Sequence, residues 1–182
     1  MKTRKFESVE QYVQICENNT GLGIKIIDKK NINDRKIVTV VGDDDDNGSL
    51  KKICGGAISF CVDTTKEGRI YVAAVANDLY EKDNELASAL LAHEEGHLIH
   101  GHIDKLINEQ IAYVKVDGVA VIDDLMAEVQ ADSHVIKCCT KDAVNKFIAY
   151  LEAYLGIDDT TKGKDMSIRT AALRRQLSAK YA

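Results

Sequence analysis

Residues 86–102 place the strongest constraint on how this chain can fold. They contain His93-Glu94-Glu95-Gly96-His97, a match to the pattern H-E-x-x-H. Residues four apart lie one above the other on the same face of a helix, so two imidazoles at this spacing can bind one Zn²⁺ from one side. Leu86 and Leu90 precede them at helical spacing. The pattern therefore predicts a helix whose apolar stripe continues into a pair of metal ligands.

The two glutamates inside the motif are expected to lie in different environments. Glu94 is next to the histidines around the helix, where its carboxylate can face a metal-bound water. Zinc lowers the pKa of such a water toward about 7, and a carboxylate beside it can take the proton. Glu95 points to roughly the opposite side and is expected to be a surface carboxylate. The alternative is a chance match, with two core histidines and a surface glutamate.

A catalytic zinc site also needs a third protein ligand and one open position. A later segment offers Glu128 and Asp132, which are four residues apart and share a helix face. Glu128 is the predicted third ligand. Asp132 is predicted to accept the N–H of a zinc-bound imidazole and so to fix its orientation, with His93 as the preferred partner over His97.

A longer ligand pattern and a surface role without a metal are the alternatives to this prediction. The longer pattern H-E-x-x-H-x-x-G-x-x-H is not met, because His100 and Ile103 stand where its glycine and third histidine belong. Both His100 and His102 are then expected to line the cleft or to pack. The alternative for Glu128 and Asp132 is a solvent-exposed acidic stripe, which they would form together with Asp123 and Asp124.

Size, charge and cysteine content limit the class of protein. The chain has 182 residues, enough for one domain over 1–182, and its net charge of -5 with scattered basic residues makes nucleic acid an unexpected partner. Without a long apolar run, neither a secretory signal nor membrane insertion is expected. Five unpatterned cysteines, at 16, 54, 61, 138 and 139, suggest reduced thiols and a cytoplasmic location, with the last two expected to be buried.

Hydrophobic periodicity predicts an α+β fold, with a sheet-rich part over about 23–76 and a helical part over about 84–181. Strands are expected at 23–27, 36–41, 57–63 and 69–74, and helices at 6–18, 86–102, 122–139, 141–155 and 167–181. Residues 111–116 are either a short strand or a flap. The aspartate run at 43–46 is interpreted as a solvated loop rather than a calcium site, because its spacing is not that of an EF-hand.

At its motifs the chain resembles the CAAX prenyl protease and HtpX-like gluzincins. The resemblance covers residues 54–135: Glu-Leu-Ala-Ser-Ala-Leu-Leu-Ala-His-Glu-Glu-Gly-His at 85–97, Gly-His at 101–102, Glu-x-x-Ala-Asp at 128–132, and the strands before them. It implies a zincin-like domain, a small mostly antiparallel sheet packed on an active-site helix and several C-terminal helices. It also implies His93, His97 and Glu128 as ligands, Glu94 as the base, and an edge strand that holds an extended peptide.

The chain also departs from that family. We expect neither the spanning helices of its membrane members nor the signal peptides of its periplasmic members. The C-terminal His-Pro of many members is not found, which leaves Arg169 or Arg174 as the match to a downstream arginine. The ImmA/IrrE metallopeptidases are a close second resemblance, through Ile-Tyr-Val at 70–72 before the motif and the later Glu with an Ala.

The expected function is therefore a zinc metalloendopeptidase that acts on a protein or peptide substrate. The tetrahedral oxyanion needs a donor besides zinc, and His134, Arg169 and Tyr150 are the candidates. Two alternatives remain. One is a regulatory protease of the ImmA/IrrE kind that cleaves a repressor, and the other is a catalytically silent binding protein with the same fold.

Overall fold

The computed structural model describes residues 6–44, 55–116, 118–153 and 160–182, without the side chains of 160–163. Of the expected features, Asp45, Asp46 and Cys54 lie outside this part of the chain. The elements follow in the order α1 (Val9–Thr20), β1 (Ile24–Ile32), β2 (Arg35–Gly42), β3 (Ala57–Thr64), β4 (Gly68–Ala76), α3 (Asn77–Lys82), α4 (Asn84–Ile99), α5 (His102–Ile107), β5 (Tyr113–Val116), β6 (Val119–Ile122), α6 (Leu125–Cys138), α7 (Lys141–Ala153) and α8 (Thr160–Lys180).

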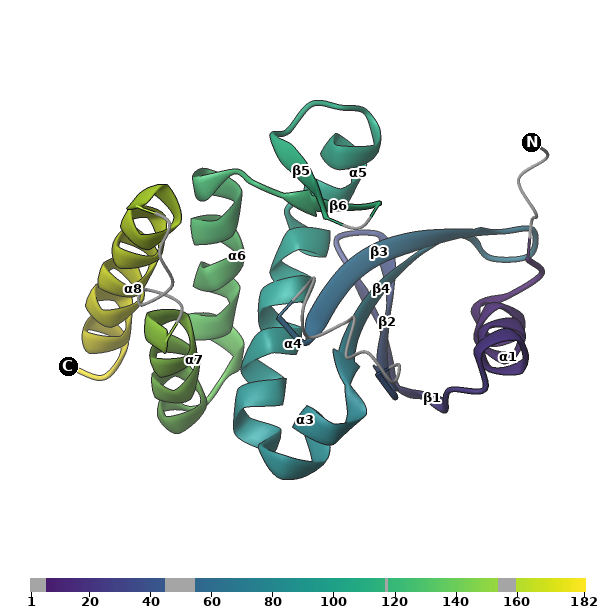
Figure 1. Cartoon of the computed structure of the whole chain (residues 1–182), viewed down its shortest axis with the longest axis horizontal. Helices are drawn as coiled ribbons and strands as arrows, with labels where there is room; N and C mark the ends of the chain where they lie inside the picture. Colours follow the sequence, from purple (N-terminus) through teal and green to yellow (C-terminus); the bar gives the residue numbers. More distant parts are fainter. Residues whose placement is uncertain (1–5, 45–54, 117, 154–159) are drawn as a thin grey trace.

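Four strands form one mixed sheet in the order β1-β2-β4-β3. The β1–β2 and β3–β4 pairs are antiparallel, and the central β2–β4 pair is parallel. The β1–β2 hairpin turns at Asn33 and Asp34, both at positive φ, as a tight two-residue hairpin requires. Because β3 is the last strand in this order, it is an edge strand, and it lies on the side of the sheet next to α4 (Figure 1).

Alternating side chains bury both faces of the central strands. Ile37 and Val41 on β2 belong to the main core with α4, whereas Val38 and Val40 pack in a second cluster with Val9 of α1. The period of two is that of a strand, and burial on both sides explains why residues 37–41 of β2 and 70–76 of β4 are apolar at nearly every position.

The helices α4, α6, α7 and α8 lie in a layer on one side of the sheet, with α4 between the sheet and α6, whereas α1 lies on the other side (Figure 1). α6 runs alongside α4 in the opposite direction, and α7 and α8 complete the layer. Side-chain caps mark the starts of the two site helices: Asp83 accepts from Leu86 N and Asp124 from Ala127 N. Among the described residues, no helix is both long enough and apolar enough to cross a membrane.

The α+β class is confirmed, with differences in detail, one of which is a second, two-stranded sheet inside the part of the chain that was expected to be helical. The four-stranded sheet is mixed, β1 continues to Ile32, and α8 already begins at Thr160 rather than at residue 167. Residues 113–116 form a strand, paired with β6. The described cysteines carry free thiols, but Cys138 is exposed, and the expectation that it is buried was wrong.

Candidate metal centre

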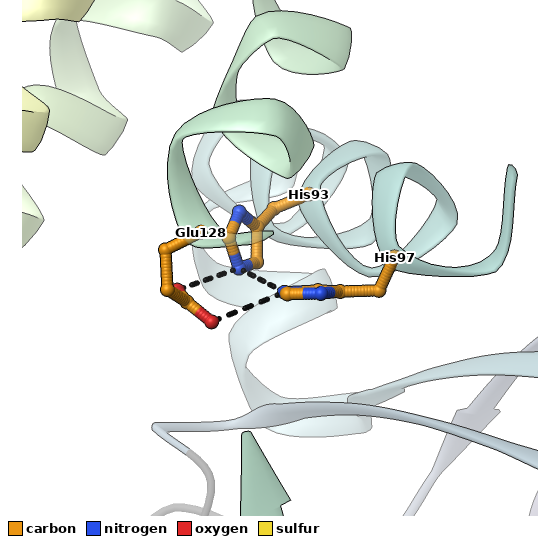
Figure 2. Close-up of side chains that lie close together, drawn as sticks. All are labelled: His93, His97 and Glu128. Atoms are coloured by element: carbon orange, nitrogen blue, oxygen red, sulfur yellow. Dashed lines mark hydrogen bonds and ion pairs between the residues drawn. The ribbon is translucent and has the colours of Figure 1, made fainter. Parts of the chain in front are cut away.

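Three side chains from two helices meet at one point. His93 and His97 lie one turn apart on α4 and project toward Glu128 on α6 (Figure 2). The two Nε2 atoms are 3.0 Å apart. Glu128 Oε2 lies 3.4 Å from His93 Nε2, and Glu128 Oε1 lies 3.3 Å from His97 Nε2. The structure thus brings together the three residues that the spacing predicted as ligands.

These separations are close to those between the ligand atoms of one metal ion. Donors at about 2.0–2.1 Å from Zn²⁺ lie about 3.4 Å from one another along the edges of a tetrahedron. Two neutral imidazoles and one carboxylate are also a donor set that zinc accepts in catalytic sites. Glu128, His93 and His97 could therefore hold such an ion, and no other group of at least three His, Cys, Asp or Glu side chains in the described part of the chain converges in this way.

Asp132 fixes the ring of His93 from behind. Its Oδ1 lies 2.9 Å from His93 Nδ1, so Asp132 lies beside His93, the partner that the sequence favoured over His97. A proton held on Nδ1 leaves the Nε2 lone pair for a metal. Asp132 is only 2% exposed, so the alternative of a solvated acidic stripe fails at this residue.

Arg169 on α8 joins the two acidic residues of α6. Its Nε and Nη2 donate to the two carboxylate oxygens of Asp132 at 2.8 and 2.9 Å, and its Nη1 lies 2.8 Å from Glu128 Oε2. The guanidinium is itself buried. A planar fork that holds one carboxylate and reaches a second is a role that the flexible ammonium of lysine does not reproduce.

The charges of the site shift the pKa values of its members. Burial alone would raise the pKa of Glu128, but Arg169 and both histidines outweigh burial and lower this pKa well below its usual value. Likewise, burial alone would lower the pKa of His93, and the carboxylates of Asp132 and Glu128 raise it to about 10. The carboxylates therefore stay ionised, as metal ligation requires.

Glu94 faces an open cavity beside this cluster. The cavity has a volume of about 400 Å³, and its walls include His93, His97 and Glu128 as well as Glu94. Tyr150 also lines it, and its hydroxyl donates to the Gly55 carbonyl at 2.7 Å. The edge strand β3 contributes residues 57–59, so the predicted edge strand does border the site.

Two expectations about the site were wrong. Glu95 does point away from the histidines, but it is buried, with its Oε1 2.5 Å from Lys30 Nζ and 3.3 Å from Thr39 Oγ1. His134 is not among the cavity residues. Its Nε2 lies 3.6 Å from Glu95 Oε2 and 3.3 Å from Cys138 Sγ, so it cannot serve as an oxyanion donor in this structure.

Sequence reasoning missed one contact of the site. His102, expected to line the cleft or pack, is buried with its Nδ1 3.0 Å from His97 Nδ1. Its Nε2 lies 3.0 Å from Gln130 Oε1. The sequence feature that could have predicted this contact is Gly101, because a glycine can end the helix before His102 and allow the chain to turn back toward His97.

Comparisons with known proteins do not place the chain in a family. No family model matches it, and no curated protein or solved structure is significantly similar to it.

Proposed function

We propose that the chain is a zinc-dependent peptidase of the gluzincin type. The observation that carries the proposal is the convergence of His93 Nε2, His97 Nε2 and the two carboxylate oxygens of Glu128, at 3.0 Å between the two nitrogens and 3.3–3.4 Å between each nitrogen and its nearest oxygen. A bound zinc would supply a Lewis acid and lower the pKa of a water at its open position. The resemblance to the CAAX prenyl protease, HtpX-like and ImmA/IrrE families stays a prediction.

Glu94 is the residue that would move the proton. It follows His93 directly on α4 and lines the same cavity, so its carboxylate can take a proton from an attacking water and return it to the leaving amine. The cavity beside it argues for an enzyme rather than a silent binding protein, because a purely structural metal site is closed by four protein ligands.

Arg169 is better suited to orienting ligands than to stabilising an oxyanion. Its Nε, Nη1 and Nη2 atoms all face the carboxylates of Asp132 and Glu128. The Tyr150 hydroxyl likewise donates to the Gly55 carbonyl, so it would have to turn before it could donate to a substrate. Both residues therefore contribute to the walls and the alignment of the site in this conformation.

The walls of the cavity indicate which substrates to test first. Besides the ligands and Glu94, most of its lining side chains are apolar, among them Leu90, Ile103, Val121, Phe147 and Leu151. An extended peptide with large apolar side chains next to the scissile bond matches these walls.

The test combines metal analysis with two neighbouring glutamate variants. Purified protein should contain about one zinc per chain, and the His93→Ala variant should lose it. Glu94→Gln should keep the zinc and lose cleavage of a library of apolar peptides, whereas Glu95→Gln, whose side chain faces away, should keep both. Unchanged zinc content in His93→Ala, or full cleavage by Glu94→Gln, would refute the proposal.

A further inference from the structure

A row of three polar side chains leads away from the metal centre through the back of His97. His97 Nδ1 lies 3.0 Å from His102 Nδ1, and His102 Nε2 lies 3.0 Å from Gln130 Oε1. His102 is only 1% exposed, whereas Gln130 lies at the surface. Neither His102 nor Gln130 has a part in the proton transfer assigned to Glu94.

The chain brings His102 to this place by ending a helix. On a continuous helix, a residue five positions after His97 would lie about 140° further around the axis and could not face its ring. Gly101, at φ 73°, ends α4 in the left-handed conformation, and His102 starts α5. Because a side chain is strained at such a φ, glycine is the residue that permits this turn.

Only one distribution of protons satisfies every contact of the row while His97 ligates a metal. The Gln130 oxygen accepts a hydrogen bond, so the proton of His102 is on Nε2. The lone pair of His102 is then on Nδ1, where it accepts the Nδ1 proton of His97. His97 in turn keeps the lone pair on Nε2, the atom that faces Glu128.

We propose that His102 and Gln130 are positioning residues, which hold His97 in the tautomer and orientation that bind the metal. The inference rests on the proposed zinc site. It gives His97 a neutral partner where His93 has the anionic partner Asp132, so the two imidazole ligands are held in different ways. His97 also gains a fixed orientation, because the contact with His102 opposes rotation of its ring.

The first test measures zinc affinity by competition with a chromophoric chelator. His102→Phe retains a ring of similar size and removes the acceptor, and we expect about 10- to 100-fold weaker zinc binding, the usual effect of losing a partner of a metal-bound histidine. His100→Phe is the matched control, because the His100 ring stacks on His102 with ring centroids 5.7 Å apart and a phenyl ring can retain this stacking. Wild-type affinity in a folded His102→Phe variant would overturn the inference.

A second set of variants covers the case in which the buried substitution prevents folding. Gln130 is exposed, so Gln130→Met should fold, and it should weaken zinc binding by a smaller factor. Gln130→Glu keeps an acceptor at the same reach and should restore wild-type affinity. If both variants bind zinc as the wild type does, Gln130 has no positioning role.

A third measurement reads the protons directly. Long-range ¹⁵N–¹H NMR spectra of the zinc-loaded wild-type protein should place the His102 proton on Nε2 alone. A proton on its Nδ1 would overturn this inference and leave the zinc site intact. Failure of the wild-type protein to bind zinc at all would overturn the proposed function together with the inference.

Discussion

Gly96 of α4 faces the backbone of Ala131 of α6 without a side chain between them. A Cβ at Gly96 would lie 2.7 Å from both the Cα and the carbonyl oxygen of Ala131, closer than such atoms approach in proteins. The metal-site residues have the same spacing around this contact on both helices. His93 and His97 lie three positions before and one position after Gly96, and Glu128 and Asp132 lie three positions before and one position after Ala131. The glycine therefore sets the helix separation at which Glu128 and Asp132 reach the histidines.

Gly96→Ala should separate α4 from α6. In an exposed helix this change would stabilise by up to about 1 kcal/mol, because alanine has the higher helix propensity. Here we expect the opposite sign, a loss of about 1–3 kcal/mol from overpacking, together with weaker zinc binding. Thermal unfolding of the metal-free protein and chelator competition measure the two effects.

A control follows from the fact that a Cβ at Gly96 would clash with backbone atoms of Ala131 and not with its side chain. Adding Ala131→Gly to the Gly96→Ala variant should not restore stability, because the clashing atoms are the Cα and oxygen rather than the alanine methyl group. A Gly96→Ala variant that is more stable than the wild type would show that the helices are not in close contact here.

Arg169→Met should uncover the repulsion between two buried carboxylates. Removing one partner from a buried ion pair costs about 3–5 kcal/mol, and here Glu128 and Asp132 would both lose the cation they share. Zinc should recover part of this loss, since it binds Glu128 itself. We therefore expect a larger fall in melting temperature without zinc than with it, whereas Arg174→Met, which removes an exposed pair with Glu152, should have little effect in either state.

Glu95→Gln should affect stability and not the metal. The buried carboxylate contacts Lys30 and His134, and these two partners outweigh burial and lower the pKa of Glu95. A group whose pKa is lower in the folded state stabilises the fold above its unfolded pKa, and this contribution is lost as the pH falls through the folded value. The variant should thus be less stable by about 1–3 kcal/mol near pH 7, and the difference should shrink in acid. Zinc affinity should stay at the wild-type value.

The metal-free protein should lose stability as the pH rises. Asp132 and Glu128 raise the pKa of His93 to about 10, so the contribution of the charged ring is fully present below its unfolded pKa of about 6.5 and is lost as the pH rises through about 10. Denaturant unfolding of the wild type between these values should therefore show a decline that His93→Gln lacks. Parallel curves for the two proteins would contradict the assigned partners of His93.

Several parts of the site follow from local rules in the sequence. A four-residue spacing on a helix places His93 above His97, and the same spacing places Glu128 and Asp132 on one face. Periodicity also located α4, whose N-cap is Asp83. These features depend only on helix geometry over one or two turns, so they can be read from a short stretch of sequence.

The tertiary structure alone decided what each face meets. Helical spacing predicts that Glu95 points away from the zinc ligands, but it does not predict whether solvent or another element lies on that side. In the structure, Lys30 of β1 and Thr39 of β2 contact the Glu95 side chain there. His134 was misassigned for the same reason, because it faces Glu95 rather than the cavity. The close contact at Gly96, the reach of Arg169 from α8 and the return of His102 to His97 all depend on how distant segments cross. Local spacing determines which side chains share a face, whereas only packing between elements determines their partners.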